Sequence, residues 1–218
     1  MSSGVDQARL PARWEHVARR TVDLTVVAIA LLVLAVPMLI IAMTIRLGTP
    51  GPALYRQRRL GRGGRPFTMY KFRTMRKGGS DALHRELIAR ELRGEDTSVN
   101  GSWKIDSDPR ITWIGSLLRR SSVDELPQLL NVLRGQMSLV GPRPCLDWEA
   151  EMFPARYAER FDVPPGLTGL WQVSWRSTMG TLEMLELDLA YVRSWSFWSD
   201  LAILMRTVPT LLRGHGAR

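Results

Sequence analysis

Residues 24–45 read LTVVAIALLVLAVPMLIIAMTI, and these 22 residues contain no charged side chain. A helix of this length covers roughly 33 Å, which is enough to cross the hydrocarbon core of a bilayer. A helix in a soluble core is the alternative, but such a helix rarely lacks a polar side over its whole length. A cleavable signal peptide is disfavoured because Arg46 stands where a cleavage site of small residues should lie. The stretch therefore predicts a membrane helix.

The charges on both sides of this helix bear on its topology. Arg19 and Arg20 precede it, and residues 46–77 follow it with ten basic and no acidic side chains. The positive-inside rule assigns both flanks to the cytoplasm. Pro37 removes a helix hydrogen bond near the middle and predicts a kink. A bent helix that enters and leaves one leaflet satisfies both flanks, and a plain span with an outside N-terminus is the alternative.

The net charge of +9 over 218 residues is concentrated in residues 46–77, because the rest of the chain is nearly neutral. Such a cationic segment suits phosphate groups, whether on nucleic acid, on anionic lipid or on a phosphorylated small molecule.

Cysteine and histidine content limits the possible metal sites. A single cysteine, Cys145, excludes an intramolecular disulfide and zinc sites that need paired thiolates. His16, His84 and His215 are too far apart in sequence to match a metal-ligand spacing. A metal, if one is used, is expected to be oxygen-liganded, such as Mg²⁺.

The rest of the chain predicts a mainly helical α+β domain. Two short aromatic and apolar runs, 53–55 and 67–72, flank a glycine-rich turn and predict a hairpin. Helical spacing of apolar residues predicts helices over 81–93, up to about 120, from 122–124 to 135, and over 181–192. Prolines and glycines predict that residues 141–170 are largely irregular. The expected organisation is an N-terminal flank (1–20), a membrane helix (21–46) and a catalytic domain (47–218).

A second apolar stretch, 201–212, follows Trp195 and Trp198 and carries only Arg206 as a charge. Amphipathic tryptophans beside such a stretch favour a helix that lies in the membrane interface. Packing against the core of the domain itself is the alternative.

Asp124 and Glu125 are adjacent carboxylates with several arginines close in sequence. Residues 122–125 match the S-x-x-E capping box, so a purely structural role at a helix start is one interpretation. Pro127 weakens that interpretation, because a helix that starts at Ser122 would lose a hydrogen bond there. Guanidinium groups bind phosphate oxygens through two parallel bonds, so the arginines favour a phosphate site.

Four separated motifs then occur in order along the chain. They are GPALYRQ (51–57) with KFRTM (71–75), DPRITWIG (108–115), LLRRSSVDELPQLLNVLRGQMSLVGPRP (117–144) and GLTGLWQV (166–173). Together they resemble the bacterial sugar transferase family, the monotopic phosphoglycosyl transferases that act on polyprenyl phosphate. The resemblance extends over about residues 20–212.

This resemblance implies a reaction. Asp124 would be the nucleophile that attacks the sugar-proximal phosphorus of a nucleotide-diphosphate sugar, with a UDP-sugar expected. Glu125 would be associated with the required Mg²⁺. Polyprenyl (undecaprenyl) phosphate would then take the phosphosugar from Asp124, which starts a lipid-linked glycan or exopolysaccharide. Arg119 and Arg143 would bind phosphate, with Lys71 and Arg73 as weaker candidates.

The resemblance also implies a location. The helix would be re-entrant, broken at Pro37, and the catalytic domain would lie on the cytoplasmic face of the bacterial inner membrane. The expected partners are the nucleotide sugar, polyprenyl phosphate and membrane lipids, with no nucleic acid and a possible homo-oligomer.

The chain departs from the family pattern at two places. Val36 precedes Pro37 where short members have serine, and Trp175 stands before Arg176 where glycine is common. Since tryptophan is far bulkier than glycine, a difference in the nucleotide or sugar pocket is expected. Two other functions remain as alternatives: a membrane-tethered nucleic-acid binder that uses residues 46–77, and a catalytically silent scaffold.

Overall fold

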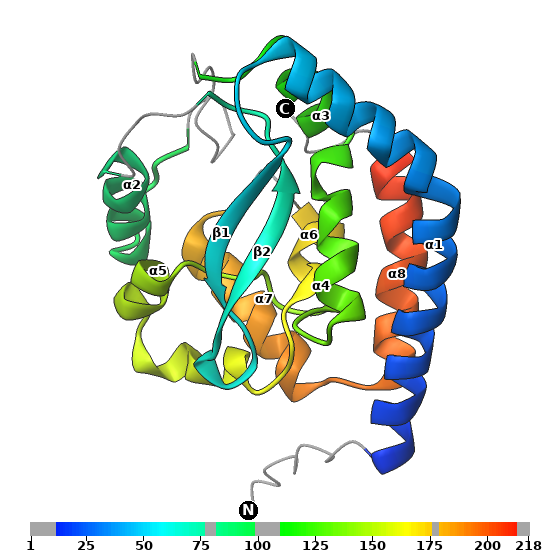
Figure 1. The fold of residues 1–218 in the computed structure, drawn as a ribbon. Helices are drawn as coiled ribbons and strands as arrows, with labels where there is room; N and C mark the ends of the chain where they lie inside the picture. The colour runs from blue at the N-terminus through cyan, green and yellow to red at the C-terminus, as the bar shows by residue number, and fades with distance from the viewer. Residues whose placement is uncertain (1–11, 77–81, 99–109, 176–178, 213–218) are drawn as a thin grey trace, which may run out of the picture.

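The computed structural model describes residues 12–76, 82–98, 110–175 and 179–212. This part of the chain is mainly helical with two small two-stranded sheets, which confirms the α+β prediction (Figure 1). Several positions named above lie outside the described residues, namely Asp81, Asp108, Arg176 and His215.

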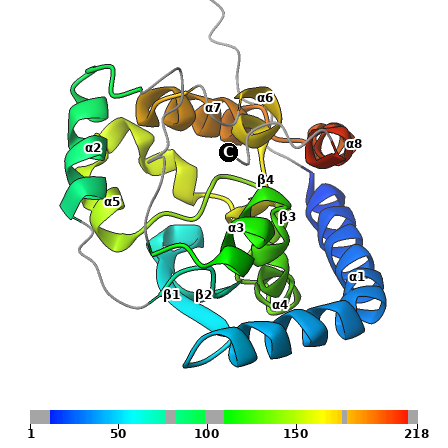
Figure 2. The same cartoon turned by 90° about the horizontal axis from the view of Figure 1, so that it is seen from above.

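Helix α1 (Arg13–Gly48) contains the whole apolar stretch and begins inside the segment expected as a flank. It is long and apolar enough to cross a membrane, and only 6% of its most apolar 18-residue window is buried. Pro37 lies within it. Figure 2 shows α1 as two arms that meet at a pronounced bend, which agrees with the kink expected from a proline inside a helix.

Both arms of α1 are attached to the same body. Near the N-terminal end, Arg19 and Asp23 bind the short strand β3 (Ser138–Val140). Near the C-terminal end, Ile45 is buried in a cluster with Phe72 and Leu118. A straight helix of 36 residues would be about 54 Å long. The bend instead returns the end of the helix to the domain from which it starts.

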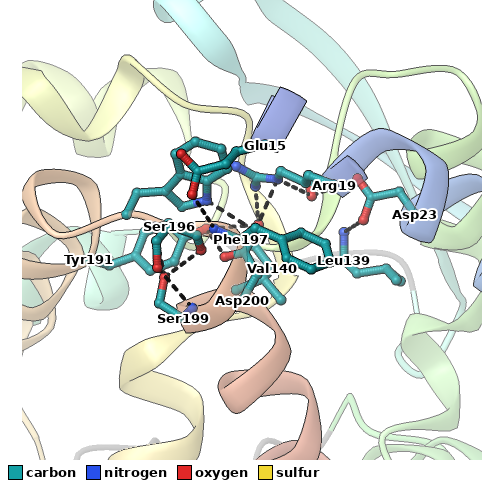
Figure 3. Close-up of polar contacts among 12 residues, drawn as sticks. Glu15, Arg19, Asp23, Leu139, Val140, Tyr191, Ser196, Phe197, Ser199 and Asp200 are labelled. Carbon is teal, nitrogen blue, oxygen red and sulfur yellow. Dashed lines mark hydrogen bonds and ion pairs between the residues drawn. The ribbon is translucent and has the colours of Figure 1, made fainter. Parts of the chain in front are cut away.

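A buried polar network holds the N-terminal arm (Figure 3). Arg19 lies 3.3 Å from Asp200 and donates to the Ser138 hydroxyl at 2.9 Å, and that hydroxyl donates to Asp23 at 2.7 Å. Tyr191 donates to Asp200 at 2.7 Å. Buried charges need such partners because desolvation without them is costly.

The predicted hairpin is confirmed. Strand β1 (Leu54–Leu60) pairs antiparallel with β2 (Pro66–Phe72) around a 3₁₀ turn at Arg62–Gly64. Gly63 and Gly64 have φ of 65° and 68°, a region that suits glycine. Strand β1 continues through a run of charged residues that the aromatic pattern alone did not mark as strand.

After the hairpin come α2 (Ala82–Leu92) and α3 (Trp113–Arg120), close to the predicted helices. The capping box considered for residues 122–125 does not form: Ser122 has φ 56° and its side chain makes no capping bond. A 3₁₀ helix (Val123–Gln128) precedes α4 (Leu129–Leu133) instead. Pro127 explains the change, because it cannot donate the bond that an α-helix needs at that position.

Residues 141–170 are more ordered than predicted. They contain α5 (Asp147–Met152), a 3₁₀ helix (Ala155–Phe161) and strand β4 (Gly166–Thr168), which pairs parallel with β3. Gly141 and Gly166 approach closely, and a Cβ on Gly166 would lie 2.1 Å from the Gly141 nitrogen. Only glycine fits there, so these residues permit the two strands to meet.

The C-terminal part consists of α6 (Leu170–Trp175), α7 (Thr181–Arg193) and α8 (Phe197–Leu212). Helix α8 lies beside the N-terminal arm of α1 (Figures 1 and 2). It buries Ile203 but leaves Trp198 66% and Met205 70% exposed. Trp195, by contrast, is buried in the core. The helix therefore packs on the domain along one side and presents apolar side chains on another.

Candidate active site

The hairpin and the following 3₁₀ helix bring together two candidate residues that are far apart in sequence. Lys71, near the end of β2, donates to Glu125 at 2.8 Å. Fully buried Asn131 of α4 fixes this arrangement, because its amide binds the Tyr70 nitrogen at 3.2 Å and the Thr68 oxygen at 2.7 Å. The β2 strand is thereby held against the helix segment that carries the two acids.

Asp124 is partly buried, and its carboxyl group has an unusual pKa. Burial raises the pKa of Asp124 to about 6, the positive charges of Lys71 and Arg119 oppose this shift, and the negative charge of Glu125 adds to it. The carboxyl group is therefore poised to change charge just below neutral pH. Tuned carboxyls of this kind gather at functional sites.

A partly open cavity with about 300 Å³ of empty space adjoins Glu125. Side chains from three of the four motifs line it, including Arg59, Lys71, Glu125, Gln128, Arg143 and Gln172. Three of these are cationic and one is acidic, so the cavity favours an anion. Arg143 also lies over the Trp171 ring, at 5.8 Å from the ring centroid.

The structure separates the six predicted site residues into two groups. Lys71, Glu125 and Arg143 share the cavity, and Asp124 is close enough to Lys71, Glu125 and Arg119 for their charges to interact.

Arg73 lies elsewhere. It is buried and donates to the carbonyl oxygens of Thr49 and Pro50, just after α1. Its guanidinium therefore binds the backbone just after the end of α1 and does not line the cavity.

The donor set fits Mg²⁺ of the kind that is shared with a substrate. Among the described residues, no three His, Cys, Asp or Glu side chains form a cluster that could hold a metal alone. Mg²⁺ is often bound through one or two carboxylates together with substrate phosphates and water. The neighbouring carboxyl groups of Asp124 and Glu125 beside a cationic cavity meet that requirement.

Three residues of the cavity were not singled out from the sequence: Arg59, Gln128 and Gln172. Gln128 and Gln172 lie within quoted motifs, so the motifs could have suggested them. Arg59 lies in a charged run of β1, where it turns inward beside Gln57, which accepts from it at 2.7 Å. The departure at Trp175 cannot be placed, since the structure describes no side chain there.

Comparison with known proteins identifies the family of the chain. The sequence model of a family described as bacterial sugar transferase matches residues 14–214. The UDP-glucose:undecaprenyl-phosphate glucose-1-phosphate transferase of Caulobacter vibrioides is 43% identical over 220 residues, which cover 95% of this chain and 74% of the relative. The exopolysaccharide production protein ExoY of Rhizobium meliloti is 36% identical over 92% of this chain and 88% of its own length.

Other relatives are much longer. The galactosyl transferase CpsE of Streptococcus agalactiae serotype III is 40% identical over 94% of this chain, but the match covers only 45% of that protein. The chain thus spans less than half the length of some curated relatives and most of the length of others.

Proposed function

Because this chain belongs to the bacterial sugar transferase family, we propose that it transfers a phosphosugar from a nucleotide-diphosphate sugar to polyprenyl phosphate. The printed names of relatives include undecaprenyl phosphate as acceptor and UDP-glucose as donor. We therefore propose a UDP-sugar and undecaprenyl phosphate as the substrate pair, and the initiation of a lipid-linked glycan or exopolysaccharide as the outcome.

The proposed reaction has two displacements at one phosphorus atom. An Asp124 carboxylate oxygen attacks the sugar-proximal phosphorus, the bond to the nucleotide phosphate oxygen breaks, and the nucleoside monophosphate leaves. A phosphate oxygen of the polyprenyl carrier then attacks the same phosphorus and releases the carboxylate. This order lets two substrates use one site in turn, as covalent catalysis permits.

The surrounding residues supply charge and alignment, which are the main requirements of phosphoryl transfer. Lys71 and Arg143 line the cavity and suit the diphosphate, while Arg119 acts on Asp124. Glu125 would hold Mg²⁺, which when bound would neutralise charge on the diphosphate. The ion pair with Lys71 orients Glu125 until then.

The observation that carries this proposal is the pair of acids beside a cavity with three cationic side chains. Trapping tests it. With donor labelled in the sugar-proximal phosphate and no acceptor, the wild-type protein should retain label and Asp124→Asn should retain none. Asp162→Asn, which alters an exposed carboxylate elsewhere, is the matched control. Full turnover by Asp124→Asn would remove Asp124 from the nucleophile's role.

For the membrane we propose that α1 dips into the cytoplasmic leaflet of the bacterial inner membrane and returns. Support comes from the bend of α1, the attachment of both arms to one body, and the exposed apolar residues such as Leu32 and Val36 near the bend. The exposed side of α8 would lie in the same interface. The site would then stand at the depth of lipid headgroups, where the acceptor phosphate is found.

The nucleic-acid alternative has less support. It needs residues 46–77 to present their charges together, but Arg59 and Arg73 are buried and Lys71 is paired with Glu125. The charges of this segment are divided between the cavity, the end of α1 and the surface.

A further inference from the structure

The turn that carries Arg143 is held by an unusual row of hydrogen bonds. The carbonyl oxygens of residues 142, 143, 144 and 145 each accept a bond, and the donors come from different parts of the chain. The Gly166 nitrogen binds Pro142 and the Leu60 nitrogen binds Cys145, each at 2.9 Å. The two carbonyl oxygens between them, those of Arg143 and Pro144, accept bonds from guanidinium groups.

Arg160 holds the turn from one side. It donates to the Arg143 carbonyl oxygen at 2.9 Å and to Asp188 at 2.6 Å. Arg160 and Asp188 are 3% and 2% exposed, so they form a buried ion pair between the 3₁₀ helix Ala155–Phe161 and α7. Burial lowers the pKa of Arg160, but the charge and hydrogen bonding of Asp188 together with the interactions with Cys145 more than offset burial, and the pKa is raised. The guanidinium therefore stays charged.

Arg59 holds the turn from the other side. It donates to the Pro144 carbonyl oxygen at 3.0 Å and lies 3.4 Å from Glu149. Glu149 in turn accepts from the Leu146 nitrogen at 2.6 Å. Arg59 and Glu149 together thus bind the backbone on both sides of Cys145.

The turn is partly packed, since Pro142, Pro144 and Cys145 are buried, and it also borders two cavities. The main cavity lies on the Pro144 side, and a smaller cavity with about 170 Å³ of empty space is lined by Pro142, Arg143, Arg160 and Phe161. Four polar bonds to consecutive carbonyl oxygens therefore hold the turn where it borders these cavities. Buried ion pairs contribute little net stability because of their desolvation cost, so a role in placing the turn accounts for them better than a role in stability.

The placement has an electrostatic cost that an anion would relieve. Burial, followed by the charge of Arg143, lowers the pKa of Arg59 to about 10. The guanidinium groups of Arg59 and Arg143 are therefore held near each other at the wall of the cavity that adjoins Glu125. A bound diphosphate would offset this repulsion.

We propose that Arg160–Asp188 and Arg59–Glu149 are positioning pairs that fix the backbone of residues 142–146 from opposite sides and so direct the Arg143 side chain toward the donor diphosphate. The inference rests on the proposed function insofar as the diphosphate belongs to a nucleotide sugar. Neither pair is assigned a chemical step.

The test uses pyrophosphate as the probe on the full chain in detergent or nanodiscs. The double variant Arg160→Met/Asp188→Leu replaces the buried pair with apolar side chains of similar size, a change that folded proteins often tolerate. We expect at least tenfold weaker pyrophosphate binding, and at least a tenfold rise in KM for the nucleotide sugar with a smaller change in kcat. The control is Arg193→Met/Glu159→Met, which removes an exposed pair between the same two elements and should change pyrophosphate affinity less than twofold.

A double-mutant cycle separates positioning from general damage. In an Arg143→Met background, loss of the Arg160–Asp188 pair should weaken pyrophosphate binding no further. An equal tenfold loss in that background, or unchanged affinity in the folded double variant, would overturn the proposal. If the double variant does not fold, Glu149→Gln provides the same cycle from the other side, with an expected severalfold loss that also disappears without Arg143.

The outcome is independent of the reaction itself. A wild-type protein that releases no nucleoside monophosphate from any sugar nucleotide would refute the proposed function, while pyrophosphate binding would still decide whether the two pairs act through Arg143.

Discussion

At Asp124, burial and charge act in opposite directions on one carboxyl group. Burial favours the neutral acid, while Lys71 and Arg119 favour the carboxylate, and the result is a pKa of about 6. A nucleophilic carboxylate must be ionised, so the group is available at neutral pH but not far below it. This balance has two measurable consequences.

The first concerns the pH dependence of activity. Because only the ionised form attacks, kcat/KM for nucleoside monophosphate release should rise about tenfold per pH unit below pH 6 and level off above it. Lys71→Met should move this rise to higher pH, since Lys71 lowers the pKa of Asp124. Lys71→Arg keeps the positive charge and should leave the midpoint near 6. A flat profile between pH 5 and 7 would contradict the assignment.

The second concerns stability. The raised pKa of Asp124 means that the folded state disfavours the charged carboxylate, a cost that grows as pH rises from the unfolded-state pKa to the folded-state pKa. Asp124→Asn should therefore be more stable than wild type by up to about 3 kcal/mol at pH 8 and by about 1 kcal/mol at pH 4.5. Unfolding in detergent with EDTA at both pH values measures this. No gain at pH 8, or a gain independent of pH, would argue against a disfavoured carboxylate.

Several site residues could be predicted from sequence motifs, but their partners could not. Asp124, Glu125, Arg143 and Lys71 stand in recognisable motifs and do lie near one another or share the cavity. Arg73 stands in the same motif as Lys71, yet it follows the end of β2, where strand alternation no longer fixes the direction of a side chain. Its carbonyl partners come from residues 49 and 50, which only the folded chain brings near.

At the level of elements, the N-terminal arm of α1 shows that a count of flanking charges does not reveal what each charged side chain binds. Under the positive-inside rule, Arg19 and Arg20 both count as cytoplasmic positive charges. The structure gives them different tasks: Arg19 pairs with buried Asp200, whereas Arg20 donates to the carbonyl oxygens of Val132 and Leu133 at the end of α4. Both therefore attach the arm to the body.

This difference predicts unequal effects on stability. Arg19→Met leaves buried Asp200 without its cation, and breaking a buried pair in this way costs about 3–5 kcal/mol. Arg20→Met removes only bonds near the surface and should cost about 1 kcal/mol. Thermal unfolding of the two variants in the same detergent gives the comparison. Equal effects would show that the Arg19–Asp200 pair does not hold the arm as described.

Sequence patterns also predict some helices and strands better than others. Helix α7, which has clear periodicity, was predicted nearly to its ends, whereas α1 extends beyond the expected 21–46 and begins at Arg13. The short elements between residues 141 and 170 were not predicted, because each has only three to seven residues. Their stability depends on the β3–β4 pairing and on side chains from other segments, which no local pattern records.

For the whole molecule, the attachment of both α1 arms to one body predicts that both ends lie on the same side of the bilayer. Single cysteines introduced as Arg13→Cys or Arg46→Cys, both at exposed positions, can be tested in a Cys145→Ser background. Neither should react with an impermeant maleimide in intact spheroplasts, and both should react after permeabilisation. Arg193→Cys on the exposed body is the reference for the cytoplasmic side. Labelling of position 13 in intact spheroplasts would indicate a full span instead.

Residues 71–73 link the end of α1 to Asp124 and Glu125. Arg73 binds the backbone at the end of α1, and Lys71, with a single residue between them, binds Glu125. In the proposed membrane orientation, three consecutive residues would therefore set the height of the carboxylates above the lipid surface. Tilting of the second arm of α1 in a thinner or thicker bilayer would then move the Lys71 ammonium directly. We therefore expect the acyl-chain length of the surrounding lipid to alter catalysis even when the substrates are unchanged.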